Sequence, residues 1–161
     1  MFAVSPERIG AVSHMSLLAV IIAVPLTAIA ALHAYWGIGG VWPGADQRSC
    51  ARAVAGFKGI DTMPSPAACF AVAGLVVAVT LVVLALGDLF ASPFARQSLA
   101  GAAFFVALVF LFRGLLGFTS YWRRLTPEMP FARLDARYYS PLCLVVGAAL
   151  AVLAFEGLAT S

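Results

Sequence analysis

Residues 67–91 read AACFAVAGLVVAVTLVVLALGDLFA, and the only formally charged residue in this stretch is Asp88. A helix needs about 20 predominantly apolar residues to cross the hydrocarbon core of a bilayer, so this stretch is long enough to span it. Three further apolar runs, 15–34, 99–118 and 141–158, contain 20, 20 and 18 residues. A chain in hydrocarbon must satisfy its own backbone hydrogen bonds, which favours helices. The sequence therefore predicts four transmembrane helices.

The composition supports the same class of protein. Of the 161 residues, 63% are hydrophobic and 11% are charged, whereas charged residues supply about a quarter of an ordinary soluble domain. We expect a single all-α membrane domain over residues 1–161, a four-helix bundle with spans at about 13–35, 67–91, 98–118 and 140–158. The net charge of +3 comes from basic residues beside apolar helices, where lipid headgroups are nearer partners than nucleic acid. We expect no nucleic-acid partner.

Basic residues are distributed unequally between the two membrane faces. Four spans place both termini and the 91–98 turn on one face, called face A, and the 35–66 and 119–140 loops on the other, called face B. Face A carries Arg8 and Arg96. Face B carries seven basic residues, which are Arg48, Arg52, Lys58, Arg123, Arg124, Arg133 and Arg137. Because basic residues in short loops mark the cytoplasmic side, we expect both termini outside the cytoplasm.

Tryptophan and tyrosine show the same asymmetry. All three tryptophans and all four tyrosines lie at or beyond the face-B ends of the predicted helices: Trp36, Trp42, Trp122, Tyr35, Tyr121, Tyr138 and Tyr139. An interfacial aromatic belt usually occupies both membrane surfaces. Two explanations remain open. Phe2, Phe90 and Phe94 anchor face A instead, or face B is where the protein meets a ligand or partner.

The first loop contains a predicted short helix. The stretch 37–44 holds four glycines and a proline, which favours an irregular turn. Asp46 can then cap a helix that ends at Gly56. Arg48 and Arg52 are four residues apart on it, and its apolar residues fall largely on the other side. Two interpretations follow, a helix lying on the membrane surface or an ordinary solvated loop helix.

Arg113 lies five residues inside the face-B end of the third span. Its side chain can snorkel to the interface along about 7 Å of helix. Alternatively it points inward, toward His33 and Asp135, where a guanidinium can hold a carboxylate, phosphate or pyrophosphate by paired hydrogen bonds. Gly114 and Gly117 let another helix or a ligand approach closely. We predict the inward orientation, with Asp135 or a bound anion as the partner and His33 nearby.

The predicted ligand-binding residues all lie near face B. They are His33, Tyr35, Trp36, Arg113, Asp135, Arg137 and Tyr139. His14 and His33 are 19 residues apart on one helix, a separation of about 28 Å, which excludes a shared haem iron. Cysteines at 50, 69 and 143 have no regular metal-binding spacing, so we expect apolar fillers and no metal site. The sequence identifies no catalytic residue and no cofactor.

Three groups of residues resemble a family of small bacterial four-helix inner-membrane proteins known only as a domain of unknown function. They are LHAYWGIGG at 32–40, RGLLGF at 113–118, and FARLD at 131–135 continuing to YSPLC at 139–143. The likeness extends over nearly the whole chain. It implies a protein of the bacterial inner membrane with no assigned activity, and it supplies no catalytic residues. All of these segments lie toward face B.

Three hypotheses for function follow. The first is a membrane protein, not demonstrably catalytic, whose face B binds an anionic lipid headgroup, a small amphipathic molecule or a partner membrane protein. The alternative is an enzyme acting on a lipid or isoprenoid, with His33 as acid or base, Asp135 orienting it and Arg113 neutralising a phosphate. The third is a small transporter, which requires a polar path from face B to Asp88 and His14.

The orientation can be tested directly. We predict that a reporter active only in the cytoplasm is silent when fused after Ser161, because face B carries seven basic residues against two on face A. The same reporter placed in the 35–66 loop is the positive control. Strong reporter activity at Ser161 would reverse the predicted orientation.

Overall fold

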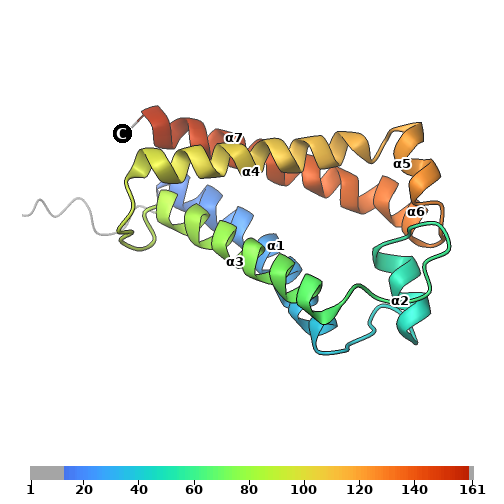
Figure 1. Ribbon diagram of the computed structural model, residues 1–161. Coiled ribbons are helices and arrows are strands. Elements are labelled where there is room, and N and C mark those ends of the chain that lie inside the picture. Colours follow the sequence, from blue (N-terminus) through green and yellow to red (C-terminus); the bar gives the residue numbers. More distant parts are fainter. Residues whose placement is uncertain (1–12, 160–161) are drawn as a thin grey trace, which may run out of the picture.

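The structure, a computed structural model, describes residues 13–159 and contains only helices in that part of the chain (Figure 1). In chain order the elements are α1 (His14–Gly37), α2 (Gln47–Val54), α3 (Pro66–Leu86), α4 (Arg96–Leu116), α5 (Ser120–Leu125), α6 (Phe131–Leu134), a π-helical segment (Asp135–Tyr139) and α7 (Ser140–Ala159). Four helical stretches are long and apolar enough to cross a membrane: α1, α3, α4 and the continuous segment Phe131–Ala159. The predicted all-α fold with four spans and a short helix between the first two is confirmed.

The second span is shorter than the predicted 67–91. Helix α3 ends at Leu86, and the backbone amide of Leu89 donates to the carbonyl of Leu84 at 3.0 Å, a bond typical of a helix C-cap. Asp88 adopts a φ of 58° at this cap, a left-handed conformation that aspartate tolerates better than most residues. The apolar run in the sequence did not indicate that the helix ends at Leu86, because several of the residues that follow are also apolar.

An ion pair holds the turn that follows α3. Arg96, the first residue of α4, donates from Nη1 to Asp88 Oδ1 at 2.9 Å and from Nη2 to the carbonyl of Leu86 at 3.0 Å. Asp88 is therefore a turn residue on face A with a cationic partner, rather than a charge within a span. Arg8, the other basic residue assigned to face A, lies outside the described residues, as does Phe2.

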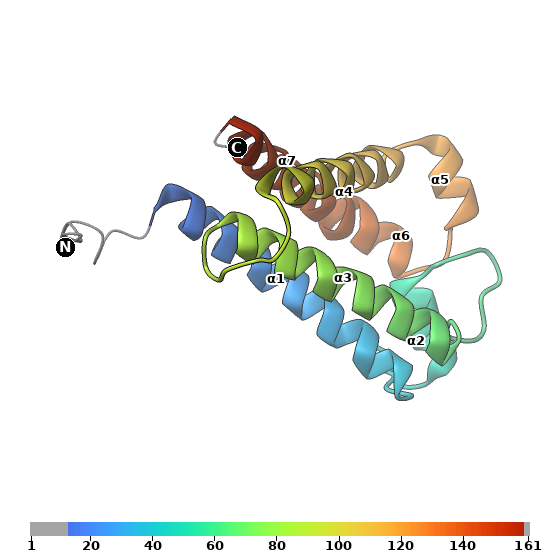
Figure 2. The same cartoon turned by 60° about the vertical axis from the view of Figure 1, so that its left-hand side comes forward.

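The four long helices form two close pairs, α1 with α3 and α4 with α7. All four contribute to one buried core, which consists of Ala19, Ile22, Leu26, Val83, Ala85, Leu86, Leu99, Ala100, Ala103, Ala107, Val146, Leu150, Leu153 and Ala154. Most of these residues lie in the half of the bundle next to face A. Toward face B the two pairs diverge, and α2, α5 and α6 lie at that end (Figures 1 and 2).

Glycines bring α4 and α7 into close contact. A Cβ at Gly147 would lie 2.8 Å from Leu111 Cγ and 3.1 Å from the carbonyl oxygen of Ala107, closer than ordinary van der Waals contact. A Cβ at Gly114 would similarly meet Leu144 of α7. Close backbone approach of this kind drives helix association in lipid, where apolar burial provides little force. Gly147 therefore faces α4.

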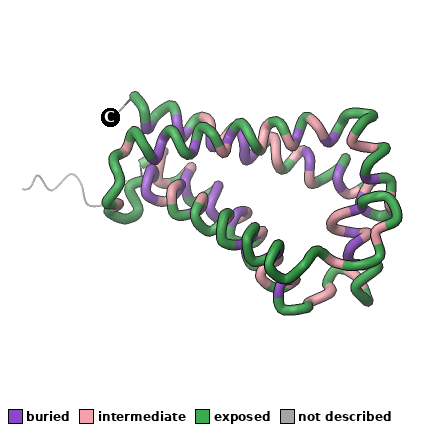
Figure 3. Tube along the Cα trace, viewed as in Figure 1, coloured by how far each residue is buried: buried purple, intermediate pink, exposed green. Residues whose placement is uncertain are grey.

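The outer surfaces of the long helices are exposed along most of their length (Figure 3). Their large apolar side chains include Leu75, Phe112 and Val145, which are 68%, 67% and 67% exposed. A soluble protein seldom leaves so many large apolar residues in contact with water. The exposed bands are therefore the surfaces suited to lipid.

We predict that Gly147→Leu lowers the stability of the detergent-solubilised protein by about 1–3 kcal/mol, because the added side chain must displace Leu111 and the α4 backbone. Thermal melting followed by circular dichroism measures the change. Gly74→Leu on α3 is the matched control, since a Cβ there meets nothing within 4 Å. Equal melting temperatures for the two variants would contradict the close packing of α4 on α7.

Candidate functional site on face B

The centre of the face-B site is the carboxylate of Asp135, which is completely buried. Its Oδ1 accepts hydrogen bonds from Arg113 Nη2 at 2.7 Å and Ser140 Oγ at 3.1 Å. Its Oδ2 accepts from Arg123 Nη2 at 2.6 Å and Trp122 Nε1 at 3.0 Å. A buried carboxylate is costly unless it is paired and hydrogen-bonded, and here both conditions are met. The predicted inward orientation of Arg113 and its pairing with Asp135 are confirmed.

Local sequence explains how α5 delivers two of these donors. Thr119 caps α5, and its hydroxyl accepts from the amide of Trp122 at 3.2 Å. The helical turn that begins at Thr119 places Trp122 over the end of α4. There the guanidinium carbon of Arg113 lies 4.5 Å from the centroid of the indole ring. Arg123 also donates to the carbonyls of Ala132 and Gly117. Arg113 is thus held between a carboxylate and an aromatic face.

The π-helical segment decides which residue joins Asp135 on α7. Ser140 follows Asp135 by five residues, and one π-helical turn brings positions i and i+5 together. Its hydroxyl also accepts from Arg113 Nη1 at 3.4 Å. Gly117 makes room for this contact, because a Cβ there would collide with Ser140 Oγ. An ordinary α-helix would have placed Tyr139 at this position instead.

The cluster around Asp135 carries a surplus of positive charge. Two guanidinium groups share one carboxylate, so Arg113, Arg123 and Asp135 together have a formal charge of +1. The side chains of the two arginines are 30% and 27% exposed, while Asp135 is fully covered. The surplus charge therefore lies on the accessible side of the cluster.

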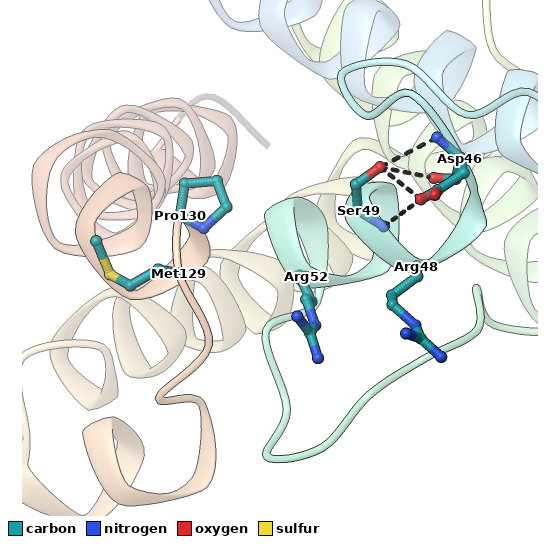
Figure 4. Close-up of a pocket in the computed structure, with 6 residues that line it drawn as sticks. All are labelled: Asp46, Arg48, Ser49, Arg52, Met129 and Pro130. Atoms are coloured by element: carbon teal, nitrogen blue, oxygen red, sulfur yellow. Dashed lines mark hydrogen bonds between the residues drawn. The ribbon is translucent and has the colours of Figure 1, made fainter.

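A second ion-pair network joins the two face-B loops. Arg48 Nε lies 3.0 Å from Asp61 Oδ1, and Arg52 lies 3.6 Å from both Asp61 and Glu128. Glu128 Oε1 accepts from the amide of Gly59 at 3.0 Å. Figure 4 shows Arg48 and Arg52 projecting from the same side of α2, at a shallow depression of about 270 Å³. It is lined by Asp46, Arg48, Ser49, Arg52, Met129 and Pro130.

Helix α2 is capped as predicted. Asp46 Oδ1 accepts from the amide of Ser49 at 2.7 Å, and Ser49 Oγ accepts from the amide of Asp46 at 3.0 Å (Figure 4). The backbone and side-chain hydrogen bonds from Ser49 hold the pKa of Asp46 below its usual value. The predicted stop at Gly56, with a φ of +64°, is also confirmed.

The apolar side of α2 packs on protein. Cys50, Ala51 and Ala53 are buried, and a Cβ at Gly56 would collide with the ring of Phe131 from α6. Burial raises the pKa of the Cys50 thiol. This side of the helix is therefore covered by α6 and its surroundings and does not face lipid, while Arg48 and Arg52 lie on the accessible side.

Four basic residues on face B form no ion pair within the described part of the chain. All four are exposed, and they are Lys58, Arg124, Arg133 and Arg137. The guanidinium of Arg137 lies 5.6 Å from the ring centroid of Tyr138. They add four exposed positive charges on face B to the net charge of +1 on the cluster around Asp135.

His33 is not part of the cluster around Asp135. Its Nδ1–H donates to the carbonyl of Ile29 at 2.8 Å, and its ring packs edge-on against Trp36 with centroids 5.0 Å apart. Within residues 13–159, His33 forms no hydrogen bond with Asp135, whose four donors come from α4, α5 and α7. The hypothesis that Asp135 orients His33 is therefore wrong, because the two helix pairs diverge at this end.

The remaining predicted residues lie in separate places. Trp36 Nε1 donates to the carbonyl of Trp42 at 2.8 Å, and the ring of Tyr35 covers Gly40, so both residues hold the turn after α1. Tyr139 donates from its hydroxyl to the carbonyl of Ala53 at 3.4 Å and thereby fastens α2.

Sequence reasoning missed three members of the cluster, Trp122, Arg123 and Ser140. The capping residue Thr119 was a signal that a helical turn begins there, and it would have directed attention to Trp122 and Arg123. Ser140 had no comparable signal, because the π-helical turn that selects it follows from packing.

The helices and the charged face define a multi-pass α-helical membrane protein whose loops are fastened by buried and surface ion pairs. Residues 26–150 match the family described as "Protein of unknown function (DUF3995)", and the chain belongs to that family. The match runs from the middle of α1 to the middle of α7 and so includes the whole of face B. No curated protein matches the chain, and no solved structure does.

We predict that Arg113→Leu lowers the free energy of unfolding by about 3–5 kcal/mol, because it leaves Asp135 buried with a reduced set of donors. Chemical denaturation in detergent measures this. Arg113→Lys restores only part of the loss, since lysine lacks the planar fork.

Arg124→Leu is the control, because Arg124 is exposed and outside the cluster. The double variant Arg113→Leu/Asp135→Leu should be more stable than the sum of the single effects predicts. Strict additivity of the two substitutions would contradict the pairing.

Proposed function

We propose that face B binds the headgroups of anionic lipids, and that the protein is a lipid-binding component of the bacterial inner membrane with this face in the cytoplasm. The observation that carries the proposal is the set of four exposed cations that form no ion pair with any described residue, Lys58, Arg124, Arg133 and Arg137. Lys58 and Arg124 lie between spans, and Arg133 and Arg137 lie in the first residues of the helical stretch Phe131–Ala159. Basic groups beside a bilayer attract anionic headgroups by about 1 kcal/mol each.

The arrangement of the loops favours specific binding of lipid headgroups over non-specific electrostatic attraction to an anionic membrane surface. Arg133 and Arg137 flank Asp135 in sequence, and the buried ion pairs of Asp135 fix that segment against α4 and α5. The backbone that carries Arg133 and Arg137 is thereby held in place, and each guanidinium can donate two hydrogen bonds to a phosphate. Arg113 and Arg123 add a net charge of +1 with Asp135. Anionic phosphate is therefore the ligand chemistry that this face fits.

The enzyme hypothesis has less support from the geometry. It assigned His33 as acid or base next to Arg113 and Asp135, whereas His33 hydrogen-bonds to the carbonyl of Ile29 and Arg113 hydrogen-bonds to Asp135. A small amphipathic molecule with an anionic group would use the same cations, and a partner membrane protein with an acidic segment would also compete for them. The membrane lipid is the ligand that is always present at this depth.

We predict that protein reconstituted in nanodiscs containing equal phosphatidylglycerol and phosphatidylcholine retains phosphatidylglycerol preferentially on release into native mass spectrometry. Replacing all four unpaired cations by glutamine should remove the preference, because each charge contributes about 1 kcal/mol, or about fivefold in affinity.

The matched control keeps every charge: Lys58→Arg combined with Arg124→Lys, Arg133→Lys and Arg137→Lys. Equal retention of both lipids by the wild-type protein would overturn the proposal. An unchanged preference in the glutamine variant would show that these cations act only in setting membrane orientation.

A further inference from the structure

Helix α5 has its hydrogen-bonding side against the protein and an apolar side outward. Trp122 and Arg123 are partly buried, and both donate hydrogen bonds to Asp135. On the other side, Tyr121 and Leu125 are four residues apart, so they share one face of the helix, and they are 65% and 39% exposed. A helix at a water-facing surface has the reverse arrangement, with its apolar side inward and its charged side outward. The outer side of α5 is therefore suited to an apolar medium.

An exposed apolar stripe on α4 leads directly to this surface. Leu108, Phe112 and Leu115 follow one another at steps of four and three residues, and all three are exposed. The amide of Phe118 donates to the carbonyl of Leu115 at 3.1 Å, and Phe118 is 54% exposed. Because α4 is long and apolar enough to cross a membrane, this stripe is the side of α4 suited to lipid. The apolar surface thus continues from the span into the loop that carries α5.

The direction of α5 fits a position along the membrane surface. Residues 117–119 connect it to α4, and it runs across the direction of α4 in both views (Figures 1 and 2). A helix that lies along the surface can insert an apolar side at the boundary between headgroups and acyl chains. Tyrosine and arginine suit this boundary, because each combines an apolar stem with a polar tip. Tyr121 and Arg124, both exposed, supply these side chains on α5.

We infer that the outer side of α5, formed with Phe118 by Tyr121 and Leu125, inserts at the boundary between headgroups and acyl chains of the membrane that the long helices cross. The occupant of this surface is the bilayer, because the adjoining stripe on α4 already faces lipid. The contact is apolar and does not require a headgroup charge, so the inference goes beyond the proposed binding of anionic headgroups. The inner side of the same helix supplies two of the four donors to Asp135. The polar centre therefore lies on the protein side of a membrane contact.

Crosslinking from position 121 tests the inference in an otherwise unaltered chain. Tyr121 is replaced by photoreactive benzoylphenylalanine, the protein is reconstituted in nanodiscs of phosphatidylcholine alone, and adducts are identified by mass spectrometry. The same substitution at Phe112 is the reference within a span, and at Thr62, exposed in the loop after α2, it is the reference in water. We expect lipid adducts at 121 to be about tenfold more abundant than at 62 and similar to those at 112. Adducts at 121 no more abundant than at 62, or crosslinks to a second protein chain, would overturn the inference.

The accessibility of a nitroxide provides a second measurement that does not depend on crosslinking chemistry. Leu125→Cys carries the label in a chain whose native cysteines are replaced by alanine, and melting curves establish that this chain is folded. We expect oxygen to relax the label more than a water-soluble nickel chelate does, because oxygen concentrates in apolar surroundings. Labels at Phe112 and Thr62 again mark the two extremes. Relaxation dominated by the chelate would place α5 in water, and weak relaxation by both reagents would indicate a protein neighbour; either result would overturn the inference.

The outcomes separate the inference from the proposed function. Preferential retention of phosphatidylglycerol by a protein whose position 121 forms no lipid adduct would leave headgroup binding standing and overturn the insertion of α5. Abundant adducts at 121 without any preference for phosphatidylglycerol would support the insertion and count against the proposed function. Adducts that form only when phosphatidylglycerol is present would make the contact a consequence of headgroup binding, which would overturn an independent apolar contact.

Discussion

A carboxylate removed from water has to be compensated, and the compensation of Asp135 organises face B. Its four donors come from α4, α5 and the start of α7, so one buried group joins three elements. Removing any partner would leave the charge buried without its full set of hydrogen bonds, which costs far more than a surface ion pair contributes. The loops that carry the free cations are fixed because this centre is fixed.

The bundle is closed at one end and divergent at the other. Next to face A, small and branched side chains from all four long helices form one core, and Gly87 and Gly157 allow close contacts there. Near face B, the glycines of α4 and α7 keep that pair together while the α1/α3 pair separates from it. The polar centre therefore stabilises one helix pair and its loops, while the opposite pair is held mainly by the core next to face A.

This division assigns different tasks to the two faces. Face A has a short turn closed by Asp88 and Arg96, and it serves packing. Face B has long loops with capped helices, two ion-pair networks and, within residues 13–159, four cations that form no ion pair. Structural charges are normally balanced, because unpaired ones add nothing to folding. The unbalanced charges are consequently the basis of the proposed binding of anionic headgroups.

The sequence by itself determined the membrane class, the four spans and the capped helix after Asp46, because hydropathy and capping patterns act over a few neighbouring residues. It also indicated the pairing of Arg113 with Asp135, since a charge inside a span needs a partner. Only the tertiary structure decided that Ser140 and Arg123 join this pair and that His33 does not. Those outcomes depend on a π-helical turn and on the angle between helix pairs, which many distant contacts set together.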